Sequence, residues 1–480
     1  MAHTVEKIGG TSMSRIDELR DALIIGDREG PDLYGRIFVV SAFGGITNLL
    51  LEHKKTGEPG VFAAFANDDV SDHGWHERLD TVAQAMREAH AHVLDHPADV
   101  ESADAFVRER VLGARDCLID LQRLVSYGHF RLYEHMGQTR ELLSGLGEAH
   151  SAFVTALMLT RAGVNARFID LSGWRDRGDV SLDERIMGAM ERVDPTTEMP
   201  IVTGYAQCAE GLMSEFDRGY SEVTFSRLAA LTGAREAIIH KEFHLSSADP
   251  NLVGAQNVRK LGRTNYDVAD QLSNLGMEAI HPKAAKMLRQ SGVPLRVTNA
   301  FEPHDPGTLI DDQPAEQAAV EIVTGLDLYA LEVFEQDMVG VKGYDAAILD
   351  VLTRHNVRIV SKVSNANTIT HYVDASLKTL RRVEKDLNSR FPSADVTSRA
   401  ISMASVVGRD LAGLSVLQRG LVAIAEAGLE AIGASQGPRN VDVQFILERD
   451  SLKPVIAALH GALVEQNSAQ KARPKLSRAA

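Results

Sequence analysis

Short apolar runs alternate with amphipathic segments up to about residue 310 of the chain. The runs are rich in Val, Ile and Phe, which is typical of strands buried on both sides of a parallel sheet. Between them apolar residues recur every three or four positions, as Ile16, Leu19 and Leu23 do, and this spacing predicts helices. The alternation favours an α/β fold with an open, mostly parallel sheet and helices on both faces. The predicted strands are residues 4–8, 36–40, 166–170, 199–203, 236–240 and 293–298, and the predicted helices are 14–25, 47–55, 148–161, 221–232, 268–275 and 282–291.

Two parts of the chain depart from this alternation. Residues from about 75 to 135 show long helical patterns and predict an all-helical insertion, and a short helix is expected at 315–324. The last third repeats a strand–loop–helix–strand–strand–helix order, with glycine loops that begin at Gly340 and Gly408. This repeat predicts two ferredoxin-like α+β units in tandem. The predicted domains are residues 1–312, 326–397 and 398–465, followed by a tail, 466–480, that lacks periodicity and is expected to be disordered.

Composition narrows the function classes. With 51 Lys+Arg against 66 Asp+Glu the formal net charge is −15, which argues against a broad basic face for nucleic acid. The two cysteines, Cys117 and Cys208, form neither a disulfide framework nor a paired-cysteine motif. Because no long apolar run or secretory signal is evident, we expect a cytoplasmic protein that binds no membrane. The histidines do not form a His-Glu-x-x-His motif, so we expect no metal site.

Two glycine turns follow predicted strands near the start of the chain. The first is Lys7-Ile-Gly-Gly-Thr-Ser12, in which Gly9 and Gly10 would let backbone N–H groups surround a phosphate beside the Lys7 ammonium. The second runs from Ser41 through two glycines to Thr47. In an open α/β sheet such loops can meet at the carboxyl edge, where ligands bind. No P-loop motif occurs, and two ordinary tight turns remain the alternative.

Two further charged positions lie beside predicted helices. Glu148 follows Gly145-Leu-Gly147 and is expected to open a helix, where it could receive an ammonium group. Arg218 precedes Gly219 and Ser221 ahead of another helix, and its guanidinium could form a forked pair with a carboxylate. Taken singly, a residue of this kind is more often structural or on the surface, by about three to one.

Taken together, these motifs resemble those of aspartate kinases, within the amino acid kinase family. The opening lysine and glycine turn, the Val-Val-Ser-Ala segment that ends at Thr47-Asn48, and the Gly-Glu-x-x-Ser pattern occur in the family's order. The doubled C-terminal unit resembles the family's two ACT domains. The quoted segments are Lys7-Ile-Gly-Gly-Thr-Ser12, Val39 to Asn48, Gly147-Glu148 with Ser151, Thr203-Gly-Tyr205, Ala248-Asp-Pro250, Tyr266 to His281-Pro282, and Gly307-Thr308.

The resemblance implies ATP-dependent phosphorylation of the side-chain carboxylate of L-aspartate, with ATP bound together with Mg²⁺. The product, 4-phospho-L-aspartate, opens the route to lysine, threonine and methionine. Carried over by motif, Lys7, Gly9, Gly10 and Ser41 would hold phosphates. Thr47, Glu148, Arg218 and Ser221 would hold aspartate, and Lys7 and Arg218 would act in catalysis.

The chain departs from the family pattern at a few clustered positions. Glu222 stands where the family has aspartate, and Glu278 stands where it has a phosphate-facing lysine. We expect Lys241 or Lys283 to replace that lost charge. The segment His240-Lys-Glu-Phe-His-Leu-Ser246 also differs, and the whole set resembles the specialised branch of aspartate kinases linked to ectoine biosynthesis.

The ACT resemblance implies a regulatory site for a small amino acid and a homodimer or larger homo-oligomer. The candidate effector residues are Gly340, Gly343, Ser361 and Asn365, with weak feedback by lysine or threonine expected. Two other functions remain open. One is an amino-acid sensor that has a kinase-like fold but no longer binds ATP, and the other is a kinase for glutamate or acetylglutamate.

Overall fold

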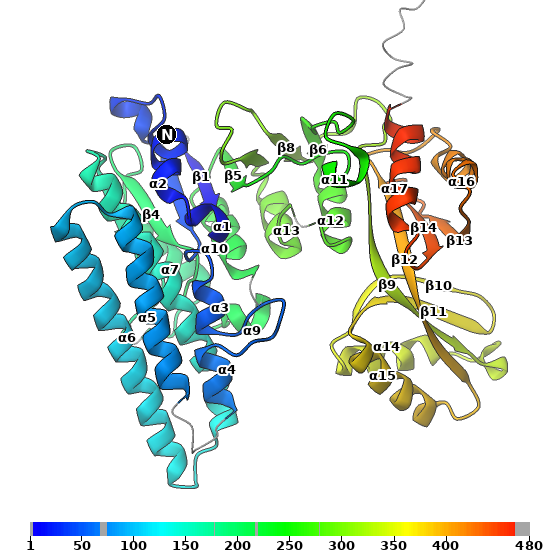
Figure 1. The fold of residues 1–480 in the computed structure, drawn as a ribbon, viewed down its shortest axis with the longest axis horizontal. Coiled ribbons are helices and arrows are strands. Elements are labelled where there is room, and N and C mark those ends of the chain that lie inside the picture. The colour runs from blue at the N-terminus through cyan, green and yellow to red at the C-terminus, as the bar shows by residue number, and fades with distance from the viewer. Residues whose placement is uncertain (1–2, 68–73, 177, 217–218, 278, 466–480) are drawn as a thin grey trace, which may run out of the picture. The chain divides into compact units, whose positions relative to one another are not determined.

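The computed structural model describes residues 3–67, 74–176, 178–216, 219–277 and 279–465. The chain divides into two compact units, which are described separately (Figure 1). The first comprises Met1–His244 and Ile280–Asp312, and the second comprises Leu245–Ala279 and Gln313–Ala480. Compactness thus groups residues 245–279 with the C-terminal part, whereas the sequence pattern groups them with the first 312 residues. The functional domain limits drawn from the sequence remain predictions, and the predicted disordered tail lies outside the described residues.

The first unit is built on a mostly parallel sheet, as the sequence predicts. Every pairing among these strands is parallel except that β8 runs antiparallel to β7. Parallel strands place their carboxyl ends at one edge, so the loops that leave them converge there. In spatial order the strands are β3 (Ala166–Ile169), β4 (Met199–Thr203), β2 (Arg36–Val40), β1 (Thr4–Ile8), β5 (Glu236–Lys241), β7 (Leu295–Asn299) and β8 (Thr308–Asp311).

The central strands of this sheet are buried along their whole length. β1, β2 and β4 each consist of five buried residues, which explains why their sequences show no polar alternation. Helices cover the sheet, and two long ones form the predicted insertion. The helices of the first unit are α1 (Gly10–Met13), α2 (Ile16–Leu19), α3 (Ile46–Leu50), α4 (Val61–Ala66), α5 (Gly74–Val93), α6 (Pro97–Ser126), α7 (Met136–Arg161), α8 (Leu182–Met190), α9 (Leu212–Phe216), α10 (Tyr220–Leu231) and α13 (Pro282–Ser291).

Helix α7 begins twelve residues earlier than predicted, so the expectation that Glu148 opens a helix is wrong. Gly145 and Gly147 suggested a helix boundary, but they lie inside α7 and allow close packing. A Cβ atom on Gly147 would lie only 2.9 Å from the Ala42 Cβ. The segment Leu132–Arg161 is long and apolar enough to span a membrane by length and composition, but 83% of its most apolar window is buried inside the protein.

The second unit contains one antiparallel sheet of six strands. The helix predicted at 315–324 is wrong, because β9 (Ile322–Phe334) begins within that range. Residues 395–407 form one long strand, β12 (Asp395–Val407), which crosses the predicted boundary at residues 397 and 398. In spatial order the sheet is β10 (Arg358–Ser364), β11 (Thr368–Asp374), β9, β12, β14 (Asp442–Glu448) and β13 (Ala431–Gln436).

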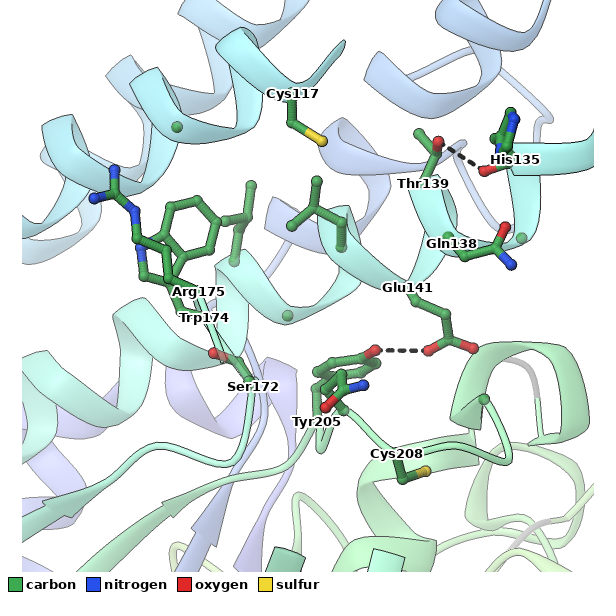
Figure 2. A pocket seen from close by; sticks show the side chains of 18 of the residues that line it. Cys117, His135, Gln138, Thr139, Glu141, Ser172, Trp174, Arg175, Tyr205 and Cys208 are labelled. Atoms are coloured by element: carbon green, nitrogen blue, oxygen red, sulfur yellow. Dashed lines mark hydrogen bonds between the residues drawn. The ribbon is translucent and has the colours of Figure 1, made fainter. Parts of the chain in front are cut away.

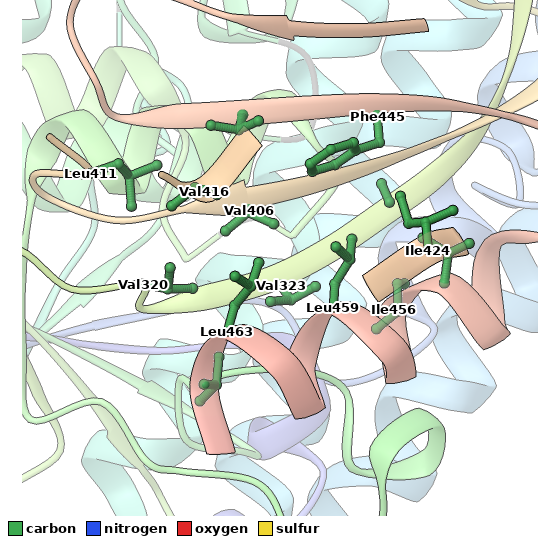
Figure 3. Packing of buried hydrophobic residues seen from close by; sticks show 14 of the residues in the cluster. Val320, Val323, Val406, Leu411, Val416, Ile424, Phe445, Ile456, Leu459 and Leu463 are labelled. Carbon is green, nitrogen blue, oxygen red and sulfur yellow. The ribbon is translucent and has the colours of Figure 1, made fainter. Parts of the chain in front are cut away.

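The two long strands divide their length between two hydrophobic cores. Leu331 and Val333 of β9 pack in one core, while Val323 of the same strand packs with Val406 and Phe445 in the other (Figure 3). β9 therefore contributes side chains to both cores of the second unit. The helices of the second unit are α11 (Pro250–Val253), α12 (Tyr266–Asn274), α14 (Tyr344–Arg354), α15 (Leu377–Arg390), α16 (Val416–Glu426) and α17 (Leu452–His460), and Arg263–Asn265 forms the short strand β6.

Candidate active site at the carboxyl edge of the parallel sheet

The loop after β1 presents a lysine and two glycines at the carboxyl edge. Lys7 lies in β1 with 7% of its surface exposed, and Gly9 forms the N-cap of α1. A Cβ atom on Gly9 would meet no other atom within 4 Å, so protein packing does not account for a glycine here. A Cβ atom on Gly10 would lie 3.1 Å from the Ala42 carbonyl oxygen, so the loop after β2 approaches closely. The two predicted glycine loops therefore lie together.

Further hydrogen bonds join these loops to each other and to α7. The Ser41 backbone N–H donates to the Ile8 carbonyl at 3.1 Å, and the Gly44 N–H donates to Ser14 Oγ at 3.1 Å. The Ser151 hydroxyl donates to the Ser41 carbonyl at 2.7 Å. Ser151 is the serine of the Gly-Glu-x-x-Ser pattern, and its hydrogen bond fixes the second loop to the helix that carries Glu148.

Glu148 is buried where α7 meets α10. Its carboxylate accepts a hydrogen bond from the Ser221 hydroxyl at 2.7 Å on Oε1, while Oε2 has no hydrogen-bond partner among the described residues. Burial raises the pKa of Glu148 to about 7, and this effect outweighs the Ser221 hydrogen bond and the positive charge of Lys7, which lower it. The site therefore holds a carboxylate with an unused oxygen that a cation would favour in its ionised form.

A second glutamate, Glu222, has 15% of its side chain exposed and lies between two lysines. Its Oε1 is 3.7 Å from the Lys7 Nζ and 3.8 Å from the Lys241 Nζ, and the His281 backbone N–H donates to Oε2. Burial would raise the pKa of Glu222, but Lys7 and Lys241 together lower it below its ordinary value. The carboxylate thus holds two ammonium groups near each other at the carboxyl ends of β1 and β5, an arrangement suited to a polyanion.

The remaining predicted residues are distributed as follows. Thr47 lies in the first turn of α3, the helix that follows the second glycine loop. Lys283 is half-exposed, pairs with Glu215 at 3.1 Å and lies over the Phe216 ring, so its ammonium group is already engaged. Arg218 and Glu278 lie outside the described residues.

The candidate effector residues lie in the second unit. Gly343 is the N-cap of α14 with φ +103°, and Gly340 also has a positive φ, of +77°. Ser361 lies in β10. Asn365 forms the turn after β10, where its side chain accepts the Thr368 backbone N–H at 2.9 Å.

The sequence did not predict a buried charged network around Glu6. Glu6 receives two hydrogen bonds from Arg36 and lies 2.9 Å from His240 Nε2, while His240 Nδ1 lies 2.8 Å from the Thr298 hydroxyl. This network crosses four neighbouring strands. Burial opposes ionisation, but the partners hold the pKa of Glu6 well below its usual value. A glutamate within a fully buried strand was the available signal.

A separate cavity of about 1090 Å³ lies beside this site (Figure 2). Neither Lys7, Glu148 nor Glu222 lines it, whereas Tyr205 does and donates a hydrogen bond to Glu141 at 2.7 Å. Both Cys117 and Cys208 also line it, although 91 positions separate them. They are free thiols, and burial raises the pKa of each, so neither is activated as a nucleophile.

Comparison with known proteins gives concordant results. Residues 3–299 match the model of the amino acid kinase family. The chain is 51% identical to aspartate kinase Ask_Ect of Stutzerimonas stutzeri (strain A1501), covering 96% of this chain and 98% of that protein. It is 23% identical to chloroplastic aspartokinase 3 of Arabidopsis thaliana, and the match covers 97% of this chain and 82% of that protein. Its fold resembles that of E. coli aspartokinase III in complex with lysine and aspartate, with a TM-score of 0.73 and 18% sequence identity. The match covers 96% of this chain and 99% of that chain.

Proposed function

The chain belongs to the amino acid kinase family, and from this premise we propose that it is an aspartate kinase, which transfers the γ-phosphoryl group of ATP to the side-chain carboxylate of L-aspartate. One observation carries the proposal most directly. A buried carboxylate with an unused oxygen, Glu148, and a pair of lysines held by Glu222 lie at the same edge of the sheet. The first suits the ammonium group of an amino acid, and the second suits phosphate.

The reaction needs positioning more than acid–base chemistry. The acceptor carboxylate of aspartate has an ordinary pKa near ~3.9, so it is ionised at neutral pH and requires no general base. The obstacle is the repulsion between this carboxylate and the triphosphate. We assign Lys7 and Lys241 to the phosphates together with Gly9 and Gly10, whose backbone N–H groups can add donors, and with Ser41, whose hydroxyl can add another.

We assign aspartate to the adjoining residues on α3, α7 and α10. Glu148 would accept the substrate ammonium, and Ser221 would keep the Glu148 carboxylate oriented through their hydrogen bond. Thr47 would contact aspartate from α3. Arg218, outside the described residues, is assigned to a substrate carboxylate on motif alone.

Lys241 is the better candidate for the phosphate-facing lysine that Glu278 displaced. It shares Glu222 with Lys7, whereas Lys283 is engaged by Glu215 and Phe216. ATP bound together with Mg²⁺ would bring further charge neutralisation to the phosphates that Lys7 and Lys241 face. E. coli aspartokinase III has been solved in complex with aspartate and ADP, which agrees with these two substrates for a chain of similar fold.

We place the enzyme in the cytoplasm, where its product would enter the aspartate family of amino acids and supply ectoine synthesis. The name of the 51% identical relative, Ask_Ect, supports the proposed link to ectoine synthesis. The second unit is proposed to bind a small amino acid near Gly340, Gly343, Ser361 and Asn365 and to mediate homodimerisation. Strong inhibition by lysine or threonine at low concentration would contradict the weak feedback expected for solute synthesis.

Trapping the acyl phosphate with hydroxylamine tests the activity. The purified full chain should form aspartyl hydroxamate with ATP and aspartate, and should form little product with glutamate or acetylglutamate. No product with any acceptor, together with no ATP binding by calorimetry, would identify a sensor instead. Preferential product formation with glutamate or acetylglutamate would identify a different amino acid kinase.

A further inference from the structure

Three metal-ligating side chains meet at the ends of two strands of the first unit, outside the set of residues assigned to the reaction. His244 follows β5, and Glu302 and Asp305 lie in the loop after β7. One ligand atom from each lies within 4.8 Å of the others. His244 Nε2 is 3.0 Å from a Glu302 carboxylate oxygen, and His244 Nδ1 is 3.7 Å from Asp305 Oδ1.

One ring nitrogen of the histidine, Nδ1, faces the Asp305 carboxylate from a position shielded from solvent. Only 13% of the His244 side chain is exposed, and within the described part of the chain Nδ1 forms no hydrogen bond although it is shielded from solvent. A buried polar atom without a partner costs on the order of 1–3 kcal/mol, so such atoms in proteins usually have a function or an additional ligand.

The carboxylates are held in position by neighbouring groups. The Asn299 side-chain amide donates to Glu302 Oε1 at 3.0 Å, and the Gly307 backbone N–H donates to Asp305 Oδ1 at 2.9 Å. The Asp305 backbone N–H also donates to the Glu302 carbonyl at 3.0 Å, which tightens the loop that carries both. Hydrogen bonds of this kind orient metal ligands and are part of most protein metal sites.

We propose that His244, Glu302 and Asp305 form a binding site for a divalent transition-metal cation. A donor set of one imidazole nitrogen and two carboxylates suits Mn²⁺, Co²⁺ or Zn²⁺ better than Ca²⁺ or Mg²⁺, which prefer oxygen ligands alone. Three protein ligands leave coordination positions for water or another oxygen ligand. The sequence did not predict this site, because His244 and Glu302 lie 58 positions apart and form no local motif.

The site can be tested on the full chain without nucleotide or aspartate. After treatment with a chelator, the protein is titrated with ZnCl₂ and MnCl₂ by calorimetry, and bound Mn²⁺ is examined by pulsed electron paramagnetic resonance. We expect one saturable site per chain and the signature of a single imidazole nitrogen. His244→Ala should weaken binding at least about tenfold and abolish the nitrogen signature. His304→Ala, which removes an exposed imidazole from the same loop, should leave both unchanged.

Other results would overturn the proposal. Absence of saturable binding by the wild-type chain, equal affinity in His244→Ala, or an equal loss in His304→Ala would each show that the cluster is only an ion pair. If His244→Ala does not fold, Glu302→Gln replaces it, because the Glu302 side chain is 55% exposed and should tolerate the change. That variant should also bind at least about tenfold more weakly, and unchanged affinity would refute the site. Since no kinase substrate is present, this result is independent of the hydroxylamine assay.

Discussion

Glu148 and Glu222 are two glutamates at the same sheet edge whose pKa values shift in opposite directions. Glu148 is buried and Glu222 is largely shielded from water, and this shielding alone would raise the pKa of each. Glu222 lies between Lys7 and Lys241, and their charges reverse the effect of burial. Glu148 accepts a hydrogen bond from the Ser221 hydroxyl and lies near Lys7, but burial outweighs both and raises its pKa to about 7. The comparison shows that the charges of two nearby lysines outweigh burial at Glu222, whereas burial dominates at Glu148.

The largest expected effect concerns the phosphate side of this comparison. Lys7→Ala removes a positive charge from the site proposed for the triphosphate and leaves Glu222 with Lys241 alone. We expect kcat to fall by about 10²–10³-fold, as when one preorganised donor to a transition state is removed. Hydroxylamine trapping measures it, and Lys55→Ala, at an exposed lysine, is the control. An unchanged kcat for Lys7→Ala would refute the assignment.

The next prediction is that substitutions of Glu148 and Glu222 change different kinetic parameters. Glu148→Gln removes the charge that would face the substrate ammonium, so KM for aspartate should rise by about 10–100-fold, in line with the loss of a charge-assisted hydrogen bond. Glu222→Gln should instead lower kcat with a smaller change in KM for aspartate, because it disturbs the lysine pair. Steady-state kinetics with both substrates varied makes the distinction. If both variants changed the same parameter, the division of roles would be wrong.

A smaller effect distinguishes the two candidate replacement lysines. Lys241→Ala should raise KM for ATP by about tenfold, since Lys241 shares Glu222 with Lys7. Lys283→Ala should change it little, because Lys283 is paired with Glu215. ATP titrations at saturating aspartate measure both. The reverse ranking would assign the role to Lys283, and full turnover by the double variant would exclude both.

The smallest effect is on stability and depends on pH. Glu148 has a folded pKa of about 7, above the ordinary value of 4.5, so the folded state binds more protons between these values and its stability falls as pH rises through this window. Glu148→Gln should therefore raise the free energy of unfolding by about 1–2 kcal/mol at pH 8 and much less at pH 5.

Glu222 should behave in the opposite way. Its pKa is lowered, so its stabilising contribution is present above the ordinary value and is lost as pH falls below it. Glu222→Gln should therefore destabilise the protein at pH 8 and have less effect in acid. Denaturant unfolding at both pH values tests the pair of variants, and shifts of the same sign at pH 8 would contradict the comparison.

Much of the first unit could be predicted from sequence because its signals are local. The strands at 4–8, 36–40 and 199–203 have the predicted bounds, since continuous apolar runs identify strands buried on both faces. Gly145 and Gly147 misled the prediction of α7, because a glycine that allows close helix packing looks the same in sequence as one that ends a helix. The sequence pattern at 315–324 predicts a helix, but β9 begins at Ile322 and is a strand because it pairs with β12 along its whole length.

The sequence by itself determined the α/β order, the two glycine loops and the family resemblance, because buried strands, tight turns and short motifs are encoded by neighbouring residues. Only the tertiary structure decided that Glu222 joins Lys7 to Lys241, that Glu148 keeps an unused oxygen, and that β9 contributes to two cores. These features depend on burial and on charges brought together from distant parts of the chain. The pKa of a carboxyl group follows from that environment and not from its position in the sequence.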